Sequence, residues 1–194
     1  MRQLLPVETV SLESAAMPVH IVCETHSTTT DNESGIATGW LPGQLSVTGE
    51  QLAAELGRRR TGDGISSVFC SDLARATQTA AIAFAGSGIP VLADWRLREC
   101  DYGELNGAPA ALVQGQRAKR LDLPYPGGES WRQAVARISW FLGDLPRRWA
   151  GQRVLVIGHV ATRWGLDHSL RGIPLEELAA ADVPWQPGWE YLLN

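Results

Sequence analysis

Three short apolar runs in this chain end beside residues that carry chemistry, and segments with helical spacing separate them. The runs occupy residues 19–23, 67–70 and 154–158. Continuous apolar runs of this length are typical of strands that are buried on both faces, as in parallel sheets. Because strands and helices alternate, we expect an α/β fold. It would be a three-layer sandwich with a mostly parallel central sheet and helices on both faces.

Periodicity and capping signals predict the other elements and the domain organisation. Thr48 is the expected N-cap of the first helix. The tract at about residues 100–128 is interrupted by glycine and proline, so we expect an irregular flap over the site. Residues 1–17 lack strong periodicity and are expected to form an N-terminal arm, which leaves residues 18–194 as a single domain. We expect strands at residues 90–93 and 153–158, and helices at residues 48–60, 73–85, 129–149 and 162–170.

Composition and charge narrow the class of partner. The chain has 194 residues, a net charge of −4 and no basic run. Nucleic acids and anionic membranes select clustered lysine and arginine, so neither is expected as a partner. Cys23, Cys70 and Cys100 are far apart in sequence, and we expect them to be buried reduced thiols. A cytoplasmic protein that binds a small molecule is therefore predicted, with homodimer formation left open.

Two histidines and one arginine follow the predicted strands. His26 and His159 come just after residues 19–23 and 154–158, and Arg75 lies at the start of the helix that follows residues 67–70. Parallel strands bind ligands outside their carboxyl ends, so these side chains should meet in one crevice. A guanidinium beside the N–H groups of a helix start forms an anion site. The pattern predicts phosphoryl chemistry.

Six separated motifs make the chain resemble the histidine phosphatase superfamily, also called the phosphoglycerate-mutase-like family. The resemblance runs from residue 19 to about residue 178 and implies the fold of that family. The matching residues are His26 with Asn32, residues 39–49, Ser71-Asp72 with residues 75–80, residues 96–99 with Tyr102, Gly103 and Gly107, Gly128-Glu129-Ser130, and residues 154–159.

The resemblance also implies roles for individual residues. His26 would be the nucleophile that takes the phosphoryl group, while Arg75 and a protonated His159 would hold its oxygens. Glu99 would protonate the leaving oxygen and then activate water, with a pKa raised by the bound phosphate. Asn32 and Ser27 are assigned to phosphate binding. No cofactor or metal is implied.

The chain departs from the family pattern around the nucleophile. The family motif Arg-His-Gly-Glu is replaced by Thr25-His26-Ser27-Thr28, and Glu24 stands where an apolar residue is usual. Losing one arginine from an oxyanion clamp typically costs on the order of 3 kcal/mol of transition-state stabilisation. Glu24 is expected to pair with Arg75 or Arg163, or to bind a substrate hydroxyl or amine. Glu24, Thr25 and Arg163 are therefore assigned to substrate shaping.

These residues predict a metal-independent phosphomonoesterase that acts on a small phosphorylated metabolite. Hydrolysis is preferred to transfer because the flap is short for a mutase. One alternative is a catalytically silent relative that binds a phosphorylated ligand or partner. Another is a metallo-hydrolase with Glu24, His26 and His159 as ligands, although these lack the close spacing of common metal motifs. Trp185 and Trp189 predict either a stacking surface for a substrate ring or a strand that seals the sheet edge.

Overall fold

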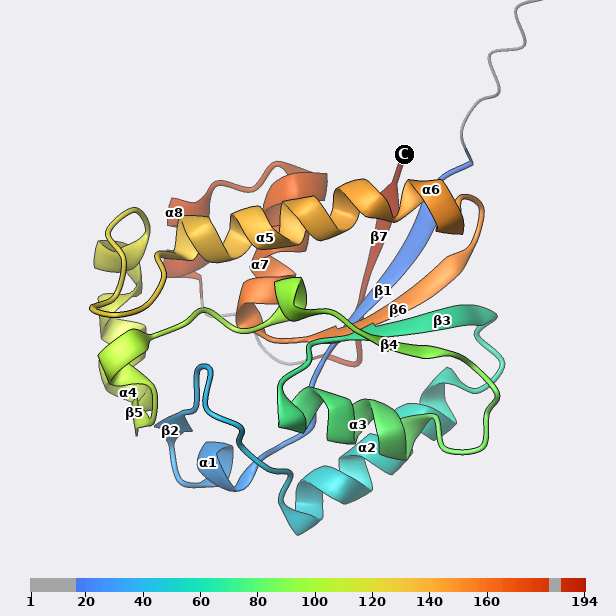
Figure 1. Ribbon diagram of the computed structural model, residues 1–194, viewed down its shortest axis with the longest axis horizontal. Coiled ribbons are helices and arrows are strands. Elements are labelled where there is room, and N and C mark those ends of the chain that lie inside the picture. Colours follow the sequence, from blue (N-terminus) through green and yellow to red (C-terminus); the bar gives the residue numbers. More distant parts are fainter. Residues whose placement is uncertain (1–16, 182–185) are drawn as a thin grey trace, which may run out of the picture.

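A five-stranded sheet forms the centre of the computed structural model, which describes residues 17–181 and 186–194. Its order is β4-β3-β6-β1-β7 (Figure 1). The first four strands in this order run parallel, and β7 is antiparallel to β1, so the predicted mostly parallel sheet is confirmed. The predicted N-terminal arm lies outside the described residues except for Met17. The strands are β1 (Val19–Thr25), β3 (Ile65–Cys70), β4 (Val91–Ala93), β6 (Arg153–Gly158) and β7 (Trp189–Leu193).

Helices cover both faces of the sheet, which confirms the three-layer sandwich (Figure 1). On one face, Leu56 of α2 and Ala76 of α3 share a core with Val22. On the other face, Ile138 of α5 and Leu166 of α7 share a second core with β1 and β6. The helices are α1 (Thr30–Glu33), α2 (Val47–Arg60), α3 (Ala74–Ala83), α4 (Ala110–Gln116), α5 (Trp131–Asp144), α6 (Pro146–Trp149), α7 (Val160–Arg171) and α8 (Leu175–Ala180).

The flap is more regular than expected. It contains α4, two short 3-10 helices at Gly103–Leu105 and Arg117–Arg120, and strand β5 (Ala108–Pro109), which pairs with β2 (Ile36–Ala37). Its aromatic residues pack against α5 and α7 in a third core. At its neck the N–H of Glu129 donates to the carbonyl of Asp101 at 2.9 Å. The expectation of an irregular tract was wrong because glycine and proline here separate short elements.

Several helix ends differ from the predictions, and three of these differences concern a cap, a break or the site. Ser46, not Thr48, is the N-cap of α2, because its hydroxyl accepts the N–H of Gly49 at 3.1 Å. The helix expected at residues 129–149 divides at Pro146, which has no N–H to donate and is favoured at the start of a new helix, α6. The third difference bears on the site, since α7 begins directly after His159.

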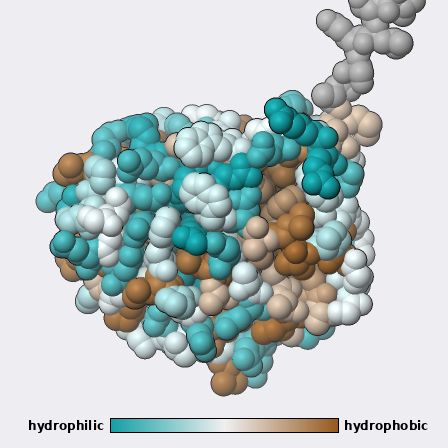
Figure 2. Space-filling view, in the orientation of Figure 1, coloured by the Kyte–Doolittle hydropathy of each residue, from teal (hydrophilic) through white to brown (hydrophobic). Residues whose placement is uncertain are grey.

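The β4 edge of the sheet exposes hydrophobic side chains. Val91 and Leu92 are each 41% exposed, and Figure 2 shows hydrophobic residues gathered on this side of the molecule. Homodimer formation stays a prediction, as does the single-domain boundary.

At the opposite edge Trp189 is buried in β7, so this tryptophan belongs to an edge strand, while Trp185 lies outside the described residues.

The cysteines are buried free thiols, as expected. Burial raises the pKa of Cys70 to about 11 and raises the pKa of the other two further. Within residues 17–181 and 186–194, the helices are too short or too polar to cross a bilayer.

Candidate active site

The register between β1 and β6 places two histidines side by side. Thr25 pairs with Gly158 at the carboxyl ends of these parallel strands, and His26 and His159 are the next residues. The N–H of His26 donates to the carbonyl of Gly158 at 2.9 Å. The two imidazole centroids lie 4.9 Å apart. Both rings therefore occupy the same crevice at the sheet edge.

His26 presents an unprotonated ring nitrogen to the site. Its Nδ1 lies 2.8 Å from the carbonyl oxygen of Ser27. A carbonyl only accepts hydrogen bonds, so Nδ1 carries the proton and Nε2 keeps its lone pair. Burial, followed by the charge of Arg75, lowers the pKa of His26 to about 3. The half-buried imidazole is therefore neutral at pH 7, which is the state that attacks phosphorus.

Arg75 links the two histidines from the start of α3. Its Nε donates to Nε2 of His26 at 3.3 Å, and its Nη2 lies 3.3 Å from Nδ1 of His159. The same guanidinium donates to the carbonyls of Gly39 at 2.8 Å and Leu41 at 3.1 Å. Arg75 is only 2% exposed, so its position is fixed by the loop before α2 as well as by the histidines.

His159 offers a hydrogen-bond donor with no acceptor. Guanidinium nitrogens only donate, so Nδ1 accepts from Arg75 and the neutral ring carries its proton on Nε2. This Nε2 is buried and has no partner among the described residues. Burial and then Arg75 hold the pKa of His159 well below its usual range. The lowered pKa and this tautomer give a neutral His159 whose Nε2–H is available to an oxyanion, and protonation of His159 beside a bound phosphoryl group stays a prediction.

Glu99 lies at the N-terminus of α7. Its Oε1 accepts the N–H groups of Cys100 at 2.8 Å and Ala161 at 3.1 Å, and its Oε2 accepts only that of Val160, at 3.3 Å. A carboxylate is stabilised at this end of a helix by the macrodipole and the free N–H groups. Glu99 faces the same cavities as His26.

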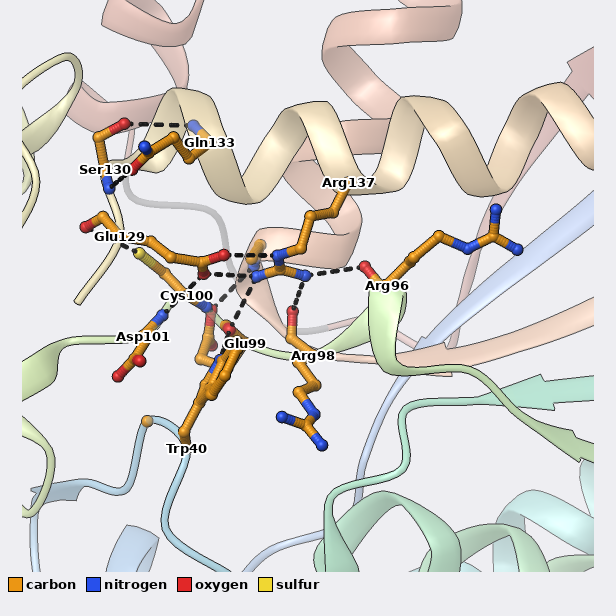
Figure 3. A network of polar contacts seen from close by, with 12 residues as sticks. Trp40, Arg96, Arg98, Glu99, Cys100, Asp101, Glu129, Ser130, Gln133 and Arg137 are labelled. Carbon is orange, nitrogen blue, oxygen red and sulfur yellow. Dashed lines mark hydrogen bonds and ion pairs between the residues drawn. The ribbon is translucent and has the colours of Figure 1, made fainter.

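Other side chains fix the backbone of Glu99, as Figure 3 shows. The carbonyl of Glu99 accepts from Nε1 of Trp40 at 2.7 Å and from Nη2 of Arg137 at 3.2 Å. Arg137, from α5, also makes two 2.7 Å bonds to the carboxylate of Glu129. The backbone of Glu99 is therefore held by α5 and the loop at Trp40.

Ser27 and Asn32, which the sequence assigns to phosphate binding, lie at the site but already form hydrogen bonds within the protein. Ser27 is buried, and its N–H donates to the hydroxyl of Thr79 at 3.0 Å. Asn32 closes the capping box of α1, where its Oδ1 accepts the N–H of Thr29 at 3.0 Å. Asn32 also lines both cavities beside His26. Phosphate binding by Ser27 and Asn32 stays a prediction.

Glu24 pairs with neither Arg75 nor Arg163. Its carboxylate is 1% exposed and accepts from Nε and Nη2 of Arg60 at 2.9 and 2.6 Å. It also accepts from Nη2 of Arg59, at 3.1 and 3.2 Å to its two oxygens. The expected pairing was wrong because side chains alternate along β1, and Glu24 shares the face of Val22, against which α2 packs. The negative charge of Glu24, two residues before His26 in the chain, is thus neutralised by Arg59 and Arg60.

Three cavities with some lining residues in common lie around these side chains. The first, of about 130 Å³, is lined by His26, Arg75 and Glu99 together with flap residues that include Gln114 and Arg117. The second, of about 490 Å³, is lined by residues that include His26, His159 and Arg59, and its size suits a small molecule. The third, of about 190 Å³, is lined by residues that include Thr25 and Arg163.

The metallo-hydrolase alternative lacks an assembled ligand set. Within the part of the chain that the structure describes, no group of three or more His, Cys, Asp and Glu residues has an arrangement that could hold a metal ion. Glu24 is engaged by two arginines and is therefore not available as a metal ligand.

Sequence reasoning missed three arginines at the site. Arg59 and Arg60 end a helix, where cations are common for electrostatic reasons alone, so they gave no functional signal. Arg117 belongs to a cluster of basic residues in the flap, which was expected to be irregular. Their partners, Glu24 for Arg59 and Arg60 and two tryptophan rings for Arg117, depend on how α2 and the flap pack in the fold.

Comparison with known proteins gives consistent results. The sequence profile described as histidine phosphatase superfamily (branch 1) matches residues 23–186. A 2,3-bisphosphoglycerate-dependent phosphoglycerate mutase from Methylobacterium radiotolerans is 35% identical over 182 residues, which cover 84% of this chain and 82% of that protein. A probable phosphoglycerate mutase GpmB from Salmonella typhi is 30% identical over 161 residues, which cover 77% and 73%.

Solved structures share the fold at lower identity. YhfR from Bacillus stearothermophilus aligns with a TM-score of 0.78 at 24% identity, over 87% of this chain and 88% of that chain. A mycobacterial glucosyl-3-phosphoglycerate phosphatase in complex with VO3 aligns with a TM-score of 0.74 at 22% identity, over 86% and 88%. These likenesses extend the agreement from sequence to the arrangement of strands and helices.

Proposed function

The chain belongs to the histidine phosphatase superfamily, and on that premise we propose that it is a metal-independent phosphomonoesterase. Its substrate is a small phosphorylated metabolite, and the phosphoryl group passes through His26. This proposal rests on one observation: a ring nitrogen that can attack phosphorus lies in the same crevice as a ring N–H that can bind a phosphoryl oxygen. Nε2 of His26 is unprotonated, and Nε2–H of His159 is buried without an acceptor among the described residues.

The proposed reaction has two steps, each balanced in atoms and charge. Nε2 of His26 attacks phosphorus, an N–P bond forms, and the ester P–O bond breaks as Glu99 gives a proton to the leaving oxygen. Water then attacks phosphorus, the N–P bond breaks, and Glu99 takes the proton from water. Oε2 of Glu99 accepts a single hydrogen bond, at 3.3 Å, so this oxygen has room for the transferred proton. Arg75 and His159 donate to the phosphoryl oxygens.

Hydrolysis is preferred to transfer between metabolites. The curated relatives are named phosphoglycerate mutases, whereas phosphatases are named among the structural relatives. Hydrolysis is the prediction from the sequence, and the flap residues between Asp101 and Glu129 would set the access of water to a phosphohistidine.

Phosphate release from a panel of phosphorylated metabolites, with and without excess chelator, tests the proposal. We expect release from at least one metabolite at an unchanged rate with chelator, and competitive inhibition by vanadate. The same reactions are analysed for phosphoryl transfer to a second metabolite, which would indicate a mutase. Activity that is lost with chelator and restored by a divalent metal would contradict the proposal.

Glu99→Gln should slow the cleavage of substrates with poor leaving groups more than that of substrates with good ones. Glutamine keeps the shape of the side chain but cannot deliver a proton, so turnover of alkyl phosphates should fall by about 10²–10⁴-fold. Turnover of 4-nitrophenyl phosphate, whose leaving group needs no proton, should fall much less. We would measure kcat/KM for both substrates, because kcat/KM reports the leaving-group step and not the hydrolysis of the phosphohistidine that both substrates share. Equal losses would mean that Glu99 only positions α7 and the loop around it.

One observation favours the second candidate, ligand binding without turnover. Arg75 makes four hydrogen bonds within the protein, so few of its N–H groups remain for a phosphoryl group. A silent binder would retain vanadate or phosphate binding and show no turnover on any metabolite in the panel. The same assay therefore distinguishes the two candidates.

A further inference from the structure

Helix α2 lines the cavity of about 490 Å³ beside His26 and His159, although none of its side chains takes part in the proposed reaction. We call this cavity the α2 groove. Four residues of α2 line it at the spacing i, i+3, i+4 and i+7, which places side chains on one face of a helix. They are Leu52, Glu55, Leu56 and Arg59. A ligand whose phosphoryl group lies at His26 therefore has space to extend along this face of α2.

Two leucines give the α2 groove an apolar wall. Leu56 is 3% exposed and shares a core with Val22 and Ala76, so its position is fixed by packing. Leu52, one turn before it, is 37% exposed although it lines a cavity. An apolar group that covers Leu52 removes apolar surface of both partners from water, which favours binding.

Two threonines line the α2 groove where the family motif has charged residues. Thr25 and Thr28 stand at the positions of arginine and glutamate in the motif Arg-His-Gly-Glu. Both threonines are half-buried, and their side chains are short and uncharged. A ligand that passes them meets methyl and hydroxyl groups in place of two long ionic side chains. These two positions therefore accept an apolar ligand without burying a charge against it.

The ionic side chains that α2 contributes to the groove already have partners. Arg59 and Arg60 share the carboxylate of Glu24, and Arg60 also pairs with Asp63. Glu55 is exposed and lies within 3.9 Å of an arginine on the same helix. These charges are balanced within the protein, so they give a charged group of the ligand little reason to bind beside α2. The apolar wall is the feature of this face that a ligand can use.

We propose that the α2 groove binds an apolar portion of the substrate, a hydrocarbon chain or ring on the alcohol that carries the phosphate. This inference rests on the proposed function of the His26 site and narrows its substrate class. Leu52 is the residue that determines this specificity, because it is the exposed leucine of the wall. The substrate class is therefore a phosphomonoester with an apolar group within a few atoms of the phosphate.

Calorimetric binding of alkylphosphonates tests this assignment without relying on turnover. The probes are methylphosphonate, propylphosphonate and hexylphosphonate, which carry the same anionic group and differ in apolar length. We expect wild type to bind hexylphosphonate about tenfold or more tightly than methylphosphonate, with propylphosphonate between them. Leu52→Gln should remove most of this gain and leave the Kd of methylphosphonate unchanged, whereas Leu52→Met, which stays apolar, should keep the gain. Val47→Gln is the matched control, since Val47 is also exposed on α2 but does not line the groove.

The possible outcomes separate this proposal from the proposed function. Equal affinity of wild type for the three probes would overturn the apolar site, and so would an undiminished gain in Leu52→Gln. Thermal unfolding checks that the variants are folded, and Leu52→Ala gives the same comparison if glutamine destabilises α2. A protein that shows the gain with chain length but releases no phosphate from any metabolite would keep the α2 groove and refute the phosphatase. Phosphate release without the gain would do the reverse, and a protein that binds none of the probes would refute both.

Discussion

Replacing His26 with alanine should lower phosphate release by at least about a thousandfold, because the variant has no side chain that can form the N–P bond. The proposed reaction gives His159 a different role, because its Nε2 carries a proton and donates to the phosphoryl oxygens. The measurement is kcat on the best metabolite of the panel, together with trapping of labelled phosphohistidine in rapidly quenched wild type and variant.

His20→Ala is the matched control for this experiment. His20 lies on the same strand, β1, but is exposed and near its other end. The control should keep wild-type kcat and form labelled phosphohistidine at the wild-type level. Retention of more than about a tenth of wild-type turnover by a folded His26→Ala protein would remove His26 from the nucleophile role.

Glu24→Gln should be the most destabilising of the proposed substitutions near the site. It removes the buried carboxylate that accepts two hydrogen bonds from Arg60, which is 9% exposed and keeps Asp63 as a partner, and Arg59 loses the same carboxylate. Removing one member of a buried ion pair typically costs about 3–5 kcal/mol. For a chain of this size, 3 kcal/mol corresponds to a fall in Tm of about 6–12 °C. Thermal and urea unfolding measure this loss.

Glu55→Gln provides the comparison on the helix that carries both arginines. Glu55 is exposed and lies 3.9 Å from Arg58, so this surface pair should contribute at most about 1 kcal/mol. If Glu24→Gln were as stable as Glu55→Gln but lost metabolite turnover, Glu24 would act on the ligand instead. Glu24→Val would likewise remove the buried carboxylate that Arg59 and Arg60 share, so it is unsuitable for rebuilding an apolar position beside Thr25.

The sequence predicted best those features that depend on buried strands. The strand at residues 153–158 has the predicted bounds, because its apolar run is buried on both faces and ends at a glycine. His26 and His159 lie close together because each follows the carboxyl end of a strand, and the two strands are parallel neighbours in the sheet. The residues expected to converge there, including Arg75, therefore did so.

Features that depend on how helices pack were not predictable. Glu24 and Arg60 are 36 residues apart, and their contact depends on the rotation of α2 against the sheet. Ser46 and Thr48 are equally suitable N-caps by residue type, so only the observed backbone decides between them. The neutral state of His159 depends on burial beside Arg75, which no local pattern reveals.

The closed neck of the flap has a consequence for how this protein can diversify. Asp101 and Glu129 are joined by a backbone hydrogen bond, and Arg137 anchors Glu129 to α5. The intervening segment is thus a loop whose two ends meet, and lengthening such a loop costs little entropy. Insertions at exposed positions between residues 102 and 128 would leave the sheet and His26 undisturbed, whereas the buried residues of this segment belong to the core with α5 and α7. Evolution or grafting can therefore vary the exposed part of the flap while inheriting the arrangement of His26 and His159.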